Sequence, residues 1–166
     1  MFIDLDSFKN INDTIGHEMG DTVLQRVAEQ LSVSVRRGDT VCRFGGDGFT
    51  VIFPNITHRE DLIEAVERIM STLKKPFTVN QQLIEITASI GIAMYPQDGK
   101  KAEELLKNAD LAMYVSKERG RNRYIFFLLH GIAKNLRTNH SPPSPLPLKR
   151  GRGALSLLPT PSEPGH

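Results

Sequence analysis

The sequence predicts an α+β fold, an α/β sandwich in which a central mixed, largely antiparallel sheet is flanked by helices. Three observations predict it: stretches with apolar residues at helical spacing, short β-rich runs between them, and turn residues at their boundaries. Along the chain the order is strand, helix, hairpin, helix, hairpin, helix, strand. This order favours one mixed sheet with helices packed on it.

The first half of the chain supplies a strand, a helix and a hairpin. MFIDLD at residues 1–6 is typical of a short buried strand, with Leu5 pointing into the core and Asp4 and Asp6 on the opposite face. Residues 21–37 carry apolar side chains at helical spacing and predict an amphipathic helix. TVCRF at 40–44 and FTVIF at 49–53 are β-rich runs separated by the turn residues of a tight hairpin.

The second half repeats this pattern. Residues 59–74 again show helical spacing, and strands are expected at 77–80 and 83–94, where Pro96 ends the run. A third helix is expected from about 102 to 119, with Gly120 as its stop, followed by a last strand at 122–127.

Length and composition limit the remaining possibilities. The 166 residues suffice for one domain, and seven of the ten prolines lie in the last 26 residues, so residues 128–166 are expected to form a disordered or non-native tail. Without that basic tail the net charge falls from +2 to about −2, which argues against a nucleic-acid partner. The single Cys42 fits a reducing cytosol, and no stretch approaches the roughly 20 apolar residues of a membrane span.

Three segments carry candidate chemistry. FIDLDSFKNINDTIGHEMGD (2–21) groups oxygen ligands of the kind Mg²⁺ prefers, although strand-end and turn carboxylates are equally common. Gly45 and Gly46 leave a platform without side chains beside Asp47, although tight turns use the same residues. Lys117 and Arg121 suit phosphate oxygens, although cations at a helix C-terminus also compensate its dipole. Together the three segments indicate phosphoryl or nucleotidyl transfer.

Four motifs in order across residues 1–127 resemble those of the GGDEF domain family, the bacterial diguanylate cyclases that condense two GTP molecules into cyclic di-GMP. They are FIDLDSFKNINDTIGHEMGD, RFGGDGF, SIGIAMYP and ADLAMYVSKERGRNRY. The resemblance implies a nucleotidyl-cyclase-like palm fold, Mg²⁺ or Mn²⁺ as cofactor, and a cytoplasmic homodimer in which each subunit binds one GTP. In longer relatives a sensor domain or an EAL phosphodiesterase domain accompanies the GGDEF domain.

The resemblance also implies roles for single residues. Asp4, the carbonyl of Leu5 and Asp47 match the metal ligands, and Asp47 is placed to assist deprotonation of the ribose 3′-hydroxyl. The residues that match the remaining GTP contacts are Asn12 and Asp21 for guanine, the glycine platform of Gly45 and Gly46, and, for the β- and γ-phosphates, the backbone near Phe8 and Lys9 with Lys117 and Arg121. The product-inhibition motif RxxD is present as Arg36 to Asp39, with Arg68 as its third member.

Three departures from the family pattern leave the function open. Gly48 stands where the family has glutamate, a loss expected to reduce turnover about 10²- to 10³-fold, with Asp6 as a partial substitute. The chain enters at FIDLD, without the helix and DxLTGLxNR-type segment that open the family's domain, so an N-terminally truncated domain is expected. The alternatives are an impaired cyclase, a catalytically inactive module that binds GTP or cyclic di-GMP, and a truncated gene remnant.

Overall fold

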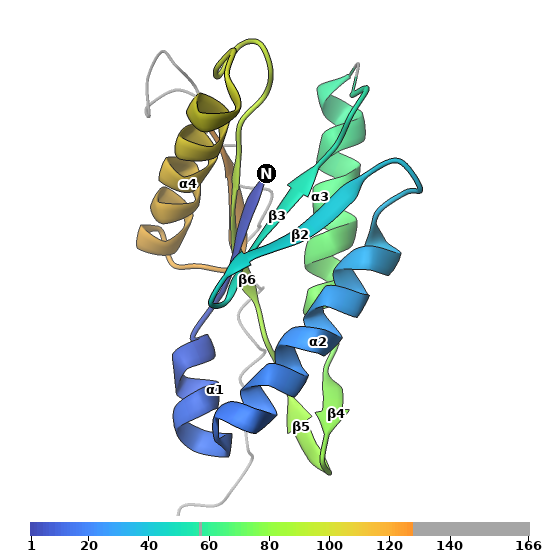
Figure 1. Cartoon of the computed structure of the whole chain (residues 1–166), viewed down its shortest axis with the longest axis vertical. Helices are drawn as coiled ribbons and strands as arrows, with labels where there is room; N and C mark the ends of the chain where they lie inside the picture. The colour runs from blue at the N-terminus through green and yellow to red at the C-terminus, as the bar shows by residue number, and fades with distance from the viewer. Residues whose placement is uncertain (57, 128–166) are drawn as a thin grey trace, which may run out of the picture. The chain divides into compact units, whose positions relative to one another are not determined.

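The computed structural model describes residues 1–56 and 58–127, so the expected tail at 128–166 lies outside the described residues. The helices are α1 (Phe8–Ile15), α2 (His17–Ser34), α3 (Arg59–Leu73) and α4 (Ala102–Glu118). The strands are β1 (Phe2–Leu5), β2 (Thr40–Gly45), β3 (Gly48–Ile52), β4 (Phe77–Val79), β5 (Gln82–Ile84), β6 (Ala88–Ile92) and β7 (Arg123–Phe126). Figure 1 shows these elements.

Five strands form one mixed sheet in the order β2-β3-β1-β6-β7, and β4 and β5 form a separate hairpin. All neighbours in the large sheet are antiparallel except β6 and β7, which are parallel. The predicted α+β class is therefore confirmed. Because β1 is the central strand, Asp4 lies between Gly48 of β3 and Ser89 of β6, its register partners.

The two faces of the sheet are covered by different helices (Figure 1). Helix α4 covers the face of Phe2, which packs in one cluster with Ala109 and Met113 of that helix. The other face carries the main core, in which side chains of β1, β3 and β6 pack with those of α2 and α3. Leu5 is 1% exposed in this core, as the alternation of β1 predicts.

Helix α4 lies unusually close to β6. Gly91 of β6 faces the helix backbone, and a Cβ at this position would overlap the carbonyl oxygen of Ala109 and the amide nitrogen of Met113. The absence of a side chain therefore sets how closely α4 approaches the sheet, and with it the position of the C-terminal end of α4.

The structure differs from the predicted elements at three places. Residues 8–15 form helix α1, which the sequence reading missed, and α2 begins at His17 rather than at residue 21. The single strand expected at 83–94 is two strands, because the chain leaves the β4–β5 hairpin before β6 enters the large sheet. Among the described residues, no helix is long and apolar enough to cross a membrane.

Candidate active site

Two acidic residues meet at the end of the central strand. Asp4 lies on β1, and Asp47 lies in the turn between β2 and β3, next to the register partner Gly48. The Leu5 amide donates to the Asp47 carbonyl oxygen at 3.4 Å, so the turn is attached to the end of β1. The structure therefore brings together the residues that the family resemblance assigned to a metal.

Lys117 forms an ion pair with this cluster from the last turn of α4. Its Nζ lies 2.7 Å from Oδ1 of Asp4, and the Asp4 side chain is only 15% exposed. Burial raises the pKa of the Asp4 carboxyl above its ordinary value, the hydrogen bond from Lys117 opposes this, and the negative charge of Asp47 raises the pKa further. Asp47 thus lies near enough to Asp4 for its charge to act on the Asp4 carboxyl.

The donor set fits a hard divalent cation. The carboxylates of Asp4 and Asp47 and the Leu5 carbonyl are oxygen ligands, and Mg²⁺ typically takes one or two protein carboxylates with phosphate oxygens and water. Within the described ranges no group of three or more His, Cys, Asp or Glu residues could hold a metal. Two protein carboxylates leave coordination positions for phosphate oxygens and water.

The glycine turn leaves open space beside Asp47. Gly45 has φ 146° and Gly46 has φ 52°, values that favour glycine, and a Cβ at either position would meet nothing within 4 Å. Arg43, to which the sequence reading gave no role, donates through Nε and Nη2 to the Gly46 carbonyl at 3.0 and 2.8 Å. These two hydrogen bonds hold the turn in place. In the sequence, the contact is indicated only by an Arg two residues before the glycine pair.

Helix α1 begins at the same end of β1, and within the described part of the chain its first two amides have no acceptor. Its N-cap, Ser7, makes no side-chain cap hydrogen bond, and the first turn has no acidic residue. The amides of Phe8 and Lys9 precede the first intrahelical donor, Asn10, which donates to Ser7 at 2.9 Å. Such amides at a helix N-terminus suit phosphate oxygens.

The residues expected to bind guanine lie where α1 meets α2. Asn12 packs against Gly20, and its buried Oδ1 has no hydrogen-bond partner among the described residues. Asp21 lines a hollow of about 360 Å³ between α2 and β2, together with Leu24, Gln25, Ala28 and Arg43. Asn12 does not line this hollow, so the structure does not bring the two residues expected to bind guanine to one cavity.

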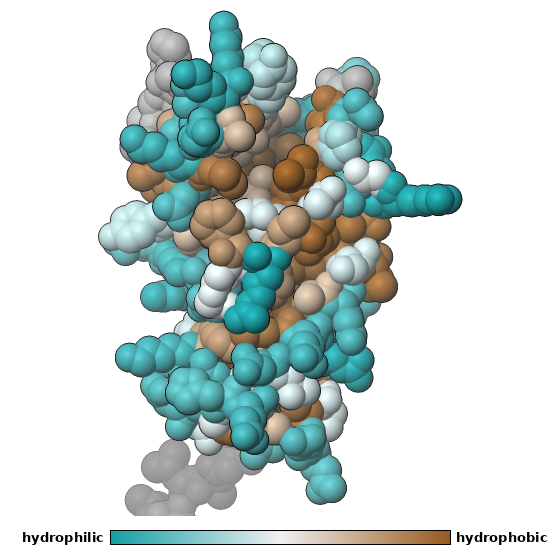
Figure 2. All heavy atoms as spheres, in the orientation of Figure 1, coloured by the Kyte–Doolittle hydropathy of each residue, from teal (hydrophilic) through white to brown (hydrophobic). Residues whose placement is uncertain are grey.

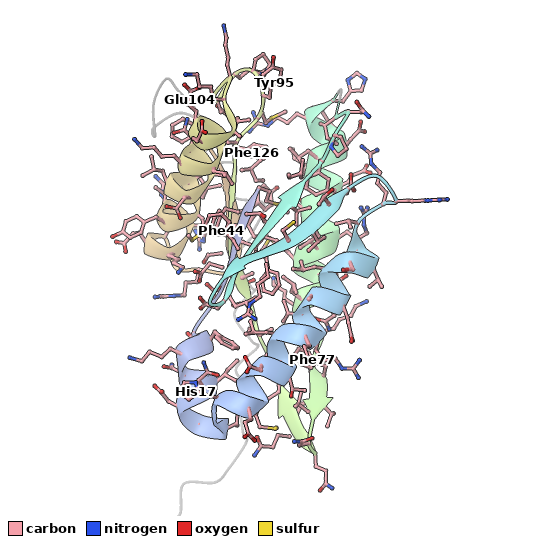
Figure 3. All side chains as sticks on the ribbon, in the orientation of Figure 1. His17, Phe44, Phe77, Tyr95, Glu104 and Phe126 are labelled. Carbon is pink, nitrogen blue, oxygen red and sulfur yellow. The ribbon has the colours of Figure 1, made fainter. Side chains whose placement is uncertain are left out.

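The other face of the hairpin is apolar. Phe44 and Ile52 are each 61% exposed, and Figure 2 shows brown side chains over the hairpin above a largely teal surface around α1. Phe44 points toward the side on which α4 lies (Figure 3), with its ring edge-on to Phe2 at a centroid distance of 5.1 Å. The glycine turn is thus flanked by a packed aromatic pair.

The RxxD residues lie away from this site, after α2. The Arg36 amide donates to Oδ2 of Asp39 at 3.0 Å, and its Nε lies 3.3 Å from Oδ1. Arg68 of α3 donates to the carbonyl of Ser34 at 2.8 Å, which places it beside the same end of α2. The structure therefore brings all three predicted residues to one region.

Comparison with known proteins identifies the family to which the chain belongs. The protein-family model described as 'Diguanylate cyclase, GGDEF domain' matches residues 1–123. The chain is 44% identical over 129 residues to MucR of Pseudomonas aeruginosa, a bifunctional diguanylate cyclase/cyclic di-GMP phosphodiesterase, covering 76% of this chain and 18% of MucR. It is 42% identical over 128 residues to the response regulator PleD of Caulobacter vibrioides, covering 75% of this chain and 28% of PleD. The chain thus spans less than a third of these relatives.

Solved structures agree with this match. The GGDEF domain of YfiN, also called TpbB, from Pseudomonas aeruginosa superimposes with a TM-score of 0.75 at 35% identity, covering 77% of this chain and 80% of that one. The GGDEF domain of DgcB from Caulobacter crescentus, solved with c-di-GMP, gives a TM-score of 0.68 at 31% identity over 75% of this chain and 74% of that one. The four motifs, the fold and these matches agree, and the chain belongs to the GGDEF domain family of diguanylate cyclases.

Proposed function

We propose that this domain binds GTP with a divalent cation at the Asp4–Asp47 cluster and, as a homodimer, condenses two GTP molecules into cyclic di-GMP at a rate reduced by Gly48. The observation that carries the proposal is the convergence of Asp4, Asp47 and Lys117 at the end of β1. Two neighbouring carboxylates, and a lysine whose Nζ lies 2.7 Å from Asp4, are groups of the kind that phosphoryl transfer uses for positioning and charge neutralisation.

The residues of the chain divide the work in this proposal. The first amides of α1, Lys117 and Arg121 hold the β- and γ-phosphates, which become pyrophosphate as each new phosphodiester bond forms. Asp47 accepts the proton of the attacking 3′-hydroxyl, while Asn12 and Asp21 select guanine through its N–H and carbonyl groups. A bound Mg²⁺ or Mn²⁺ supplies neutralisation of the phosphate charge.

Two copies are required because each new ring bond joins one GTP to the other. A site that holds a single GTP cannot close the ring, so activity depends on a second copy. The relatives that carry EAL or other domains suggest further partners for a longer parent protein.

Replacing Asp4 tests the cation site. Asp4→Asn removes the negative charge that faces both Lys117 and a bound divalent cation. Hydrogen bonds and ion pairs to charged groups are stronger than those between neutral groups, so we expect the Mg²⁺-dependent affinity for GTP to fall about tenfold or more. Calorimetric titration of GTP with and without Mg²⁺ measures it. Asp13→Asn, an exposed carboxylate on α1, is the matched control. Equal affinities for wild type and Asp4→Asn, or no Mg²⁺ effect in wild type, would contradict the proposal.

A second function, binding of cyclic di-GMP, is favoured by the RxxD cluster. Arg36 is held by Asp39 and by a bond to the Pro54 carbonyl at 3.3 Å, while much of its side chain stays exposed, so its guanidinium is positioned to stack on or fork to guanine. The relative DgcB was solved with this nucleotide. In this role the domain senses cyclic di-GMP whether or not it makes it.

Arg36→Ala is expected to weaken the binding of labelled cyclic di-GMP about tenfold, because charge-assisted contacts to the nucleotide are lost. Arg37→Ala, a change to the neighbouring exposed arginine, is expected to leave the affinity within about twofold. Equal losses in both variants would show only a general effect of positive charge. A chain that binds neither nucleotide would favour the gene-remnant alternative.

A further inference from the structure

Asp6 is a buried carboxylate that joins three distant parts of the chain. It is 8% exposed and lies directly after β1. Its Oδ2 accepts from the Thr87 hydroxyl at 2.6 Å and from the Asn122 amide at 3.0 Å, and its Oδ1 accepts from the Ser89 hydroxyl at 2.7 Å. The Asp6 amide in turn donates to the Thr87 carbonyl at 2.8 Å.

Both carboxylate oxygens are therefore occupied by protein donors. Moving Asp6 toward the glycine turn would leave two hydroxyls and one amide without an acceptor in a buried place, and each such group carries a substantial cost. Asp6 is therefore not available to substitute for the glutamate that is missing at position 48, although the sequence made it a candidate for this role.

One of the three donors belongs to a turn that needs support. Arg121 and Asn122, which follow α4, have φ values of 60° and 48°, in the left-handed region that residues with side chains rarely adopt. The Arg121 amide donates back to the Ser116 carbonyl at 3.1 Å, and the Asn122 amide is bound by Asp6. Such strained backbone persists only where its surroundings hold it.

On its other side Asp6 adjoins the start of α1. Ser7, the next residue, is itself left-handed with φ 58°, and α1 begins immediately after it. The Asp6 carboxylate and its own backbone therefore link two segments, the start of α1 and the turn of Arg121.

We propose that Asp6 is a positioning residue for triphosphate recognition: it fixes the distance between the first amides of α1 and the Arg121 turn, so that both reach the same phosphates. The inference rests on the proposed function, because it assumes that these two segments bind the β- and γ-phosphates of GTP. It assigns Asp6 no contact with substrate or metal.

The test compares GTP with GMP, which lacks the β- and γ-phosphates, by calorimetric titration of the whole chain with Mg²⁺. Asp6→Ala is expected to lower GTP affinity about tenfold, as expected for losing a charge-assisted bond, and to leave GMP affinity within about twofold. Asp98→Ala is the matched control, since Asp98 is 5% exposed and accepts the Met94 amide at 2.8 Å in the loop after β6. It is expected to reduce stability without changing the ratio of the two affinities.

Asp6→Asn keeps an oxygen that can accept from the Asn122 amide but loses the negative charge, so we expect GTP affinity to fall only about threefold and GMP affinity to stay unchanged. This variant replaces Asp6→Ala in the test if Asp6→Ala does not fold. Equal losses for GTP and GMP in the Asp6 variants, or an unchanged ratio, would overturn the inference and reduce Asp6 to a structural residue. A wild-type chain that binds GTP no more tightly than GMP would instead overturn the proposed function.

Discussion

Gly48→Glu is expected to raise the rate of cyclic di-GMP formation about 10²- to 10³-fold, the range typical of a single electrostatic group in an active site. Gly48 is the register partner of Asp4, and directly opposed residues in an antiparallel pair present their side chains on the same face. A glutamate at position 48 would therefore place a third carboxylate beside Asp4, Asp47 and Lys117.

The backbone at position 48 accepts this change. Its φ lies outside the left-handed region, and a new Cβ would lie 3.2 Å from the Gly45 carbonyl and 3.5 Å from the Phe2 ring, so the turn must shift by only a few tenths of an ångström. Gly48→Gln has the same shape without the charge and is expected to stay near the wild-type rate. Chromatographic quantification of cyclic di-GMP from GTP and Mg²⁺ measures all three, and equal rates for Gln and Glu would show that charge is not what the site lacks.

Gly91→Ala is expected to lower the free energy of unfolding by about 1–3 kcal/mol, because overpacking forces neighbouring groups to move. The atoms in the way are backbone atoms of Ala109 and Met113, which no side-chain rotation can clear. Helix α4 must therefore lift from β6, and Lys117 near its end moves away from Asp4. Urea denaturation measures the stability loss.

The control for this change is Gly38→Ala. A Cβ on Gly38 would meet nothing within 4 Å, so its effect is expected to stay within about 0.5 kcal/mol. If both variants unfold at the same urea concentration, the close approach of α4 to β6 is not what stabilises this face of the sheet.

The elements with a clear apolar period could be predicted from the sequence, and those set by distant contacts could not. Helices α2, α3 and α4 follow the expected spacing. Helix α1 also has apolar residues at helical spacing, Phe8, Ile11 and Ile15, but it is only eight residues long and its Asn, Asp and Thr residues are weak helix formers, so it was missed. The break between β5 and β6 was hidden because the alternation of buried residues, Ile84, Ile86 and Ala88, continues through it.

In the site, the residue types could be predicted and their partners could not. Asp4, Asp47 and Lys117 were candidates because their chemistry suits metal and phosphate, and the structure brings them together. The contacts of Asp6 and Arg43 were missed, because whether a carboxylate faces a metal or three protein donors depends on where Thr87, Ser89 and Asn122 arrive in space. Two hydroxyl residues two positions apart, Thr87 just before β6 and Ser89 within it, were the available signal.

The bond between Asp6 and the Asn122 amide spans 116 positions of the chain. During translation the first strand leaves the ribosome long before the helix and turn that complete its surroundings. A nascent chain arrested before residue 117 already contains Asp4 and Asp47 but lacks the lysine that pairs with them. The ion pair between Asp4 and Lys117 can therefore form only after most of the domain has been synthesised.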